Sequence, residues 1–365
     1  MEYTKTELHT HLVGMLSAEE FVNFIKKCGI MSFCFSNSVL SPDDLLSDKY
    51  YRLIQIETRI PYSKMNNLYS NRTEIIKSIV DEYSKMYNTS KSKASFFIYN
   101  LLINESLRSL VKQGVKYVEI SYSFHDRINN FIIDSDLKDK IKCKFLLSTQ
   151  RKTVAYSNIP GVHTFQEAAK NLAKVLKGGH CVGFDIMGEE TKLTDDELDY
   201  NDKMHSFMFK LELLFDTLLQ FNNTTLRIHS GETSNSFTNT TNILKMIEVI
   251  AQKRKIVIPP PEIRIGHGLY FDANKEYVDL LKKFHCIIEI NASSNIRLSN
   301  VESYKSIPYN FYLSHGIPIV ICTDSHGINK TTIKKEDKIA RVIVGDEKYE
   351  KIVSLDKEIL LQKGK

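Results

Sequence analysis

Several features that would define a class of protein are missing from this sequence of 365 residues. No apolar run approaches the roughly 18 residues that a membrane-spanning helix needs. The first residues are not followed by the apolar segment of a secretory signal peptide. The six cysteines are scattered and form no Cys-x-x-Cys pair, so no disulfide framework is expected. These absences predict a cytoplasmic protein without a membrane partner.

Two kinds of binding motif are also missing. No Gly-x-Gly-x-x-Gly sequence or P-loop follows any expected strand, which argues against an open, doubly wound sheet. The net charge of +5 comes from 49 basic and 44 acidic residues that are interleaved along the chain. Because these charges form no strong basic cluster, no dedicated nucleic-acid site is expected. The hydrophobic content of 42% is typical of a soluble globular protein with a large core.

A regular series of short apolar runs indicates the fold. These runs are mostly separated by segments with helical periodicity, which favours parallel strands joined by crossover helices. Eight such units predict an α/β fold, a (β/α)8 TIM-type barrel. No repeat or clear linker interrupts the series, so residues 1–365 are expected to form one domain. The expected strands cover residues 6–11, 117–122, 143–148, 181–188, 225–229, 263–267, 286–291 and 318–324.

Helical segments are expected between these strands, mainly in an insertion after the first strand, at about residues 31–115. Ser17 is the expected N-cap of a helix that precedes this insertion, and Glu19 and Glu20 follow it. The first part of this segment, residues 31 to about 65, is expected to be irregular and to form a lid or an insertion. Helices are expected over residues 17–28, 73–113 (two helices, the second from 95 to 112), 165–177, 202–221, 241–251 and in a tail at 330–365.

The first strand begins almost at the first residue, so no helix before it covers the floor of the barrel. Only about forty residues follow the last strand. An exposed floor of this kind predicts that a second copy of the chain or another partner covers it.

Two histidines near the start of the chain suggest a metal site. His9 and His11 alternate along the first strand and therefore point to the same side. Their spacing lets two imidazoles bind one ion, although two buried or exposed structural histidines would show the same pattern. The choice depends on whether other strands supply further ligands.

Other strand ends supply such groups, and in a barrel of this type the active site lies at the carboxyl ends of the strands. The fifth strand ends at His229, the sixth at His267 and the eighth at Asp324. Three histidines and one aspartate fit a divalent ion such as Zn²⁺, with room for a water. Glu232, three residues after His229, is placed as a proton shuttle, and His267 could orient or deprotonate the water.

In the order of its motifs the chain resembles the adenosine deaminase family of the metal-dependent amidohydrolase superfamily. The resemblance extends from Glu7 to Gly327 and depends on the order of the motifs. These are Glu7-Leu8-His9-Thr10-His11-Leu12, the segment 182–190, His229-Ser230-Gly231-Glu232, Arg264-Ile265-Gly266-His267-Gly268, Ser294-Asn295 and Thr323-Asp324.

The resemblance implies hydrolytic removal of the 6-amino group of a purine nucleoside or nucleotide, giving the inosine form and ammonia. One Zn²⁺ per chain would be held by His9, His11, His229 and Asp324. Glu232 would protonate the ring nitrogen beside the reacting carbon, and a metal-bound hydroxide would attack that carbon. His267 and Asp324 would handle the proton of the water. Gly188 would offer its backbone N–H to the purine N3, and Asp185 belongs to the same substrate-binding motif.

Two departures from the family pattern concern the substrate. Val13 stands where the family usually has an Asp or Asn that contacts the ribose 5′-hydroxyl. Ser325 stands where a second Asp usually contacts the purine N7, although a hydroxyl can donate to N7 as well. Without a carboxylate at the first position, the site would no longer repel a 5′-phosphate. We therefore expect adenosine or an adenine nucleotide as substrate.

Three further residues have two readings each. Arg151 and Lys152, expected at the end of the third strand, either attract a phosphate or form a solvated pair in a loop. His326 either contacts substrate, because it follows Asp324 by two residues, or is structural.

Three alternative functions stay open. The first is deamination of a modified adenine nucleotide or of ATP. The second is a binuclear amidohydrolase acting on cyclic amides, although the fourth strand lacks the lysine that such enzymes need at its end. The third is a non-catalytic module that binds purines.

Overall fold

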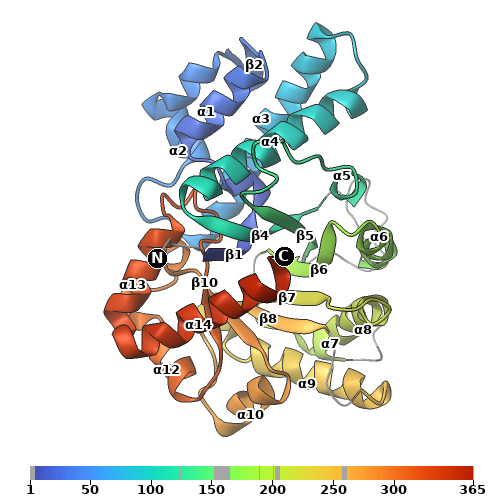
Figure 1. Cartoon of the computed structure of the whole chain (residues 1–365), viewed down its shortest axis with the longest axis vertical. Helices are drawn as coiled ribbons and strands as arrows, with labels where there is room; N and C mark the ends of the chain where they lie inside the picture. Colours follow the sequence, from blue (N-terminus) through green and yellow to red (C-terminus); the bar gives the residue numbers. More distant parts are fainter. Residues whose placement is uncertain are drawn as a thin grey trace.

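Eight parallel strands form the centre of the molecule, as the computed structural model shows (Figure 1). The structure describes residues 5–123, 125–151, 165–188, 190–199, 201, 206–256 and 261–364. Each strand of this sheet pairs with the next one along the chain, in parallel. The strands are β1 Lys5–His11, β4 Val115–Tyr122, β5 Lys142–Gln150, β6 Cys181–Met187, β7 Thr225–Ser230, β8 Glu262–His267, β9 Ile287–Ile290 and β10 Ile319–Ile321.

The sheet closes on itself where the last strand returns to the first. A parallel bridge joins Thr10 of β1 to Asp324, which follows β10. The backbone N–H of Asp324 donates to the carbonyl of His9 (2.9 Å), and the N–H of His11 donates to the carbonyl of Asp324 (2.9 Å). The predicted (β/α)8 barrel is therefore confirmed, and its closure lies beside the first pair of histidines.

Helices surround this barrel, and none that the structure describes is long and apolar enough to cross a membrane. They are α1 Ala18–Lys27, α2 Asp48–Ile54, α3 Met65–Met86, α4 Lys91–Lys112, α5 His125–Ile128, α6 Phe165–Lys177, α7 Asp195–Leu198, α8 Phe207–Leu218, α9 Asn239–Lys253, α10 Lys275–Lys283, α11 Ala292–Arg297, α12 Tyr309–Ser314, α13 Ile333–Val344 and α14 Asp346–Lys363. Ser17 caps α1 as predicted, since its hydroxyl accepts from the N–H of Glu20 (3.2 Å).

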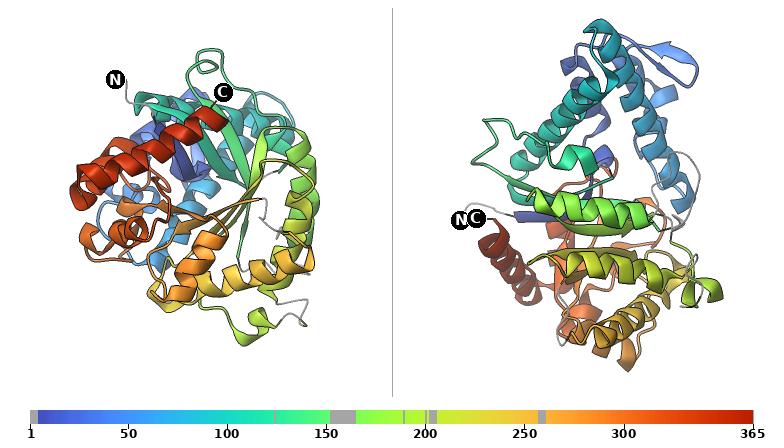
Figure 2. Two further views of the ribbon diagram at one scale, coloured as in Figure 1. Left: turned by 60° about the horizontal axis from the view of Figure 1, so that its bottom comes forward. Right: turned by 90° about the vertical axis from the view of Figure 1, so that its right-hand side faces the viewer.

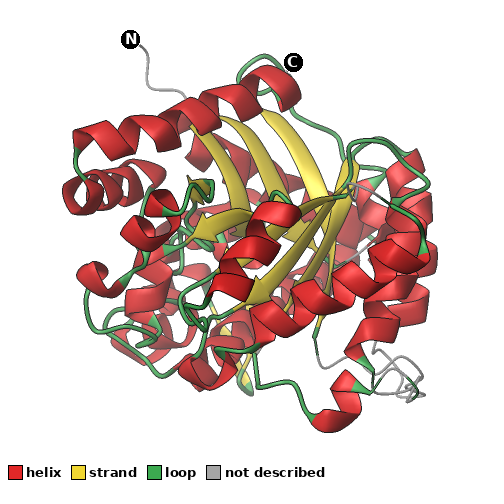
Figure 3. Ribbon diagram, turned by 90° about the horizontal axis from the view of Figure 1, so that it is seen from below, coloured by secondary structure: helices red, strands yellow, loops and turns green. Residues whose placement is uncertain are grey.

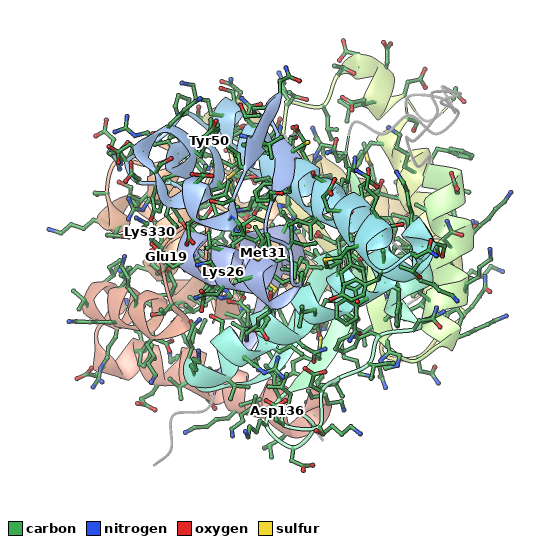
Figure 4. The ribbon with its side chains drawn as sticks, turned by 90° about the horizontal axis from the view of Figure 1, so that it is seen from above. Glu19, Lys26, Met31, Tyr50, Asp136 and Lys330 are labelled. Atoms are coloured by element: carbon green, nitrogen blue, oxygen red, sulfur yellow. The ribbon has the colours of Figure 1, made fainter. Side chains whose placement is uncertain are left out.

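The insertion between β1 and β4 stands to one side of the barrel (Figure 2). The segment that was expected to be irregular contains a hairpin, β2 Phe33–Phe35 and β3 Ser38–Leu40, followed by a 3-10 turn, η2 Pro42–Leu46, and α2. A last 3-10 turn, η3 Tyr62–Lys64, leads directly into α3, which therefore begins eight residues earlier than predicted. Figure 4 looks onto this insertion and labels Lys26 and Met31, both of which are exposed.

The C-terminal helix covers the floor of the barrel, which corrects the expectation of an exposed floor (Figure 3). Ile359 of α14 belongs to a buried apolar cluster with Leu8 of β1 and Val320 of β10. Lys5 forms an ion pair with Asp356 of α14 (3.3 Å). The chain thus supplies its own cover, and the argument for a partner at this end no longer holds. The sequence predicted helix in this tail but not that it packs against the floor, because the apolar residues of α14 are spread among many charges.

Truncating the apolar side of α14 should destabilise the barrel. Ile359 is 5% exposed, and Ile359→Ala should lower the free energy of unfolding by about 2–4 kcal/mol, since it leaves a cavity at the floor. Leu361→Ala, on the same helix but 64% exposed, is the matched control and should change it by less than about 0.5 kcal/mol. Urea denaturation of both variants provides the measurement. Equal effects would contradict the assignment of α14 as the floor.

Candidate active site

Three strands bring the four predicted metal ligands together at their carboxyl ends. His9 and His11 come from β1 and His229 from β7, while Asp324 follows β10. The ring centroids of His9 and His229 are 4.6 Å apart, and those of His11 and His229 are 5.1 Å apart. Asp324 has a left-handed backbone (φ 62°) and is fixed by the closing bridge. Its Oδ1 lies 3.4 Å from Nε2 of His11. The structure brings all four residues together.

The donor set fits a divalent metal ion. His9 Nδ1 hydrogen bonds to the carboxylate of Glu289 (2.8 Å), which leaves its Nε2 buried without a partner. His229 Nε2 is also buried without a partner. Burial, followed by the charge of Arg227, holds the pKa of His9 well below its usual value, so this imidazole is neutral and able to coordinate. A carboxylate behind a ligating histidine is the arrangement that orients imidazoles in zinc sites.

Asp185 lies with the metal ligands, and the described lining of the substrate cavity does not include it. It was predicted to contact substrate, but its side chain is fully buried at the end of β6. Its Oδ2 accepts hydrogen bonds from Arg227 (2.8 Å) and Ser121 (2.6 Å). Its Oδ1 lies 3.3 Å from His229 Nε2, and neither atom has another hydrogen-bond partner among the described residues. With His11, these two side chains form one of the groups that could hold an ion.

The turn after β7 presents Glu232 to the cavity. Gly231 adopts a positive φ of 70°, which glycine accepts at little cost, and the chain reverses there. The buried carboxylate of Glu190 accepts from the backbone N–H of Gly231 (3.0 Å) and of Glu232 (2.7 Å). It also accepts from Asn239 (3.0 Å). Glu190 thus fixes this turn, a role that the sequence did not reveal although the residue ends one of the quoted motifs.

The site contains two titratable groups whose pKa values are moved in opposite directions. Burial, reinforced by the charge of Asp324, raises the pKa of Glu232 to about 8. Burial, reinforced by His229, lowers the pKa of His267 to about 4. The two side chains lie 3.5 Å apart, from His267 Nε2 to Glu232 Oε1. At neutral pH the carboxyl is largely protonated and the imidazole is neutral. One group can therefore give up a proton and the other can accept one.

Asn295 selects the tautomer of the base. Its Oδ1 lies 3.1 Å from Nδ1 of His267, so the ring donates a proton there. Nε2 of His267 is then unprotonated and faces the cavity side, where it can accept a proton.

A cavity of about 750 Å³ opens onto these groups. His11, Glu232 and Asp324 line one part of it, and residues of α3 line another. Of the residues predicted to touch substrate, Val13 and Gly188 also line it, the latter with a positive φ of 97°.

Three other predicted substrate contacts are placed differently. Ser325 is fully buried and hydrogen bonds to the hydroxyl of Tyr69, which lines the cavity. Arg151 is not a solvated loop residue, because it is 2% exposed and donates to the carbonyl of His229. Its predicted neighbour Lys152 lies outside the described residues. His326 is buried, with Nε2 3.3 Å from the hydroxyl of Ser109, and is not among the described residues of the cavity lining.

Charged residues inside the barrel support the ligands from below. Arg227 donates to the carbonyl of Leu8 (2.6 Å) as well as to Asp185. Arg264 pairs with Glu119 (2.9 Å) and with Glu289 (3.2 Å), the residue that holds His9. Sequence reasoning missed this layer. A signal was present, because each of these charges interrupts an apolar strand that was predicted to be buried.

Comparisons with known proteins agree with this architecture. The family model described as adenosine deaminase matches residues 55–357. The adenosine deaminase of Clostridium kluyveri is 24% identical over 348 residues, which cover 91% of this chain and 81% of that protein. N6-methyl-AMP deaminase-L of Xenopus laevis is 32% identical over 89 residues, covering 24% of this chain and 26% of that protein. The Arabidopsis protein ADAL, crystallised with GMP, has the same fold, with a TM-score of 0.65 and 17% identity, covering 99% of this chain and 92% of that one.

Proposed function

The chain belongs to the adenosine deaminase family, and from this premise we propose that it hydrolyses the 6-amino group of adenosine or an adenine nucleotide, N6-modified forms included. The products are the inosine form and ammonia. The observation that carries the proposal is one cavity lined by the carboxyl of Glu232, three histidines and Asp324. Hydrolytic deamination needs a water source, an acid and a base around one pocket.

We assign the metal site to His9, His11, His229 and Asp324, with one Zn²⁺ per chain. These residues would hold a divalent ion, which would supply an acidified water. Glu232 donates its proton to the purine ring nitrogen next to the reacting carbon, which makes that carbon more electrophilic. His267 accepts the proton of the water through its unprotonated Nε2.

Substrate is positioned by the wall of the cavity. The backbone N–H of Gly188 faces the purine N3, and Val13 contacts the sugar. A contact between Ser325 and N7 would require the hydrogen bond between Ser325 and Tyr69 to open.

The cavity extends beyond the space that a nucleoside needs. Ser70, Thr73 and Lys77 line it from one face of α3. Lys77 is exposed at this side, next to the carboxylate of Glu74 in the same lining, and its ammonium is a cationic group that this face offers to a phosphate. One similar protein is named for N6-methyl-AMP, and another was crystallised with GMP. Both of these compounds are nucleoside monophosphates. These observations favour a substrate with a 5′-phosphate.

Replacing Lys77 should therefore discriminate between nucleotide and nucleoside. Lys77→Ala should raise the KM for AMP about fivefold to tenfold, because a partly exposed ion pair to phosphate is lost, and should leave the KM for adenosine unchanged. Lys85→Ala, at an exposed lysine on the same helix, is the matched control. Initial rates on adenosine, AMP, N6-methyl-AMP and ATP provide the measurement. A strong preference of the unmodified protein for adenosine would contradict the phosphate assignment.

The general test of the proposed function is the loss of ultraviolet absorbance that accompanies conversion of adenine to hypoxanthine. It should occur with the protein as purified and stop after treatment with a chelator. If no adenine nucleoside or nucleotide is converted, the proposed function is wrong.

A further inference from the structure

A segment of the insertion lies across the carboxyl end of the barrel, and we call residues 55–64 the strap. The N–H of Ile60 donates to the carbonyl of Arg297 (2.9 Å), behind β9. The guanidinium of Arg59 donates to the carbonyls of Val301 (2.8 Å) and Glu302 (2.5 Å). The strap is thus held by loops that follow the strands of the active site.

A small apolar cluster holds the strap from below. Ile56 is buried there with Leu298, from the end of α11, and with Ile328, which follows β10. Gln55 is also buried and donates to the carbonyls of Gly327 (2.8 Å) and Ile328 (2.5 Å). The cluster is separate from the main core, so the strap has an apolar anchor of its own.

The strap delivers Tyr62 to the catalytic acid. The hydroxyl of Tyr62 lies 2.9 Å from Oε2 of Glu232 and 3.4 Å from the carbonyl oxygen of Gly188. Burial and the charge of Glu232 raise the pKa of this phenol well above its usual value, so it stays neutral and donates. Tyr62 also lines the cavity. It is therefore a side chain from the insertion that touches the acid of the barrel.

This hydrogen bond decides where the proton of Glu232 lies. A neutral carboxyl has one O–H, and an oxygen that accepts from a phenol acts as its carbonyl oxygen. Oε2 accepts from Tyr62, which leaves the proton on Oε1. We propose that Tyr62 is a positioning residue, which fixes the Glu232 carboxyl and assembles the catalytic acid when the strap covers the cavity. This inference rests on the proposed function of Glu232.

The first test separates positioning from simple coverage. Tyr62→Phe keeps the ring but removes the hydroxyl, and it should lower kcat about tenfold while KM changes less than about threefold. Tyr51→Phe is the matched control, because Tyr51 lies in the same insertion, its hydroxyl donates to Glu19 at 3.4 Å, and it is outside the described lining of the cavity. It should retain the activity of the unmodified protein.

Other outcomes for Tyr62→Phe overturn the proposal. An unchanged kcat with a raised KM would make Tyr62 a cover for substrate only. A raised kcat with a lowered KM would mean that the phenol occupies space that substrate needs. A protein that deaminates adenine compounds, loses activity in Glu232→Gln and keeps it in Tyr62→Phe would refute this inference alone. Absence of any deamination in the unmodified protein would instead refute the proposed function.

The second test links the strap to the acid. Arg59 is exposed and donates to the loop that follows α11 rather than to the reacting groups, and Arg59→Ala should lower kcat several-fold because the strap is then held less firmly over the cavity. In the Tyr62→Phe background the same change should lower kcat less than about twofold, since the hydrogen bond is already missing. Fully multiplicative effects would show that the strap and Tyr62 act independently. Thermal unfolding of each variant confirms that the chain is folded.

Discussion

Replacing Glu232 by glutamine should lower kcat about 10³-fold, because the amide has the shape of the carboxyl but cannot give up a proton to the purine ring. KM should change little, since the hydrogen bond from Tyr62 can still be accepted by the amide oxygen. Steady-state rates on adenosine and AMP provide the measurement. Glu248→Gln, at a carboxylate on the surface of α9 that pairs with Lys283, is the matched control and should be fully active.

The pH profile should identify the same group. The pKa of Glu232 is raised to about 8, so the acid is protonated at neutral pH and loses its proton as the pH rises above that value. The rate should therefore be level near neutrality and fall on the alkaline side, by about tenfold for each pH unit. The residual rate of Glu232→Gln should lack this alkaline limb. If Glu232→Gln keeps full activity, Glu232 is not the acid, and the reading of the chain as a purine-binding module gains support.

Loss of the metal should have the second large effect. His11→Ala should reduce bound metal from one ion per chain to nearly none and lower the rate more than about 10³-fold, because a water without a metal is not acidified. His11 is the ligand to replace because its side chain is 12% exposed, whereas the other two histidine ligands are more deeply buried. His315→Ala, at an exposed histidine after α12, is the matched control.

Chelation should produce the same result in the unmodified protein, and added Zn²⁺ should restore both metal content and rate. Elemental analysis of the protein before and after dialysis provides the measurement. Activity that resists removal of the metal would contradict the assignment. A content near two ions per chain would instead favour the binuclear alternative, for which Asp185, with an oxygen that has no partner, is a candidate additional ligand.

Some parts of the site were predictable because they depend on local order. His9 and His11 alternate on a strand, and a strand exposes alternate residues on one side whatever its neighbours are. In a parallel barrel every strand delivers its last residues to the same end, so His229 and Asp324 were expected beside them. The structure groups His9, His11 and Asp324 closely enough to hold an ion and places His229 in overlapping groups with His9 or His11, and the role of each stays a prediction until the variants are measured.

Other parts depended on contacts that no local pattern encodes. The motif around Asp185 predicted a contact with substrate, yet Asp185 faces Arg227 across the interior of the barrel. Arginine is usually a surface residue. The ring of Phe207 nevertheless lies 5.2 Å from the guanidinium of Arg151, and the carbonyl of His229 accepts a hydrogen bond from it. Packing decides which neighbour a long side chain contacts, and packing involves residues far apart in the chain.

The sequence by itself determined the barrel, its family and the order in which the ligands arrive, because strand period and motif order are properties of short segments. Only the tertiary structure decided three further features. They are the closure of the barrel at Asp324, the covering of its floor by α14 and the approach of Tyr62 to Glu232. Each of these joins residues more than a hundred positions apart. Such contacts form only when the whole chain has found a packing that buries its apolar surface and pairs its buried charges.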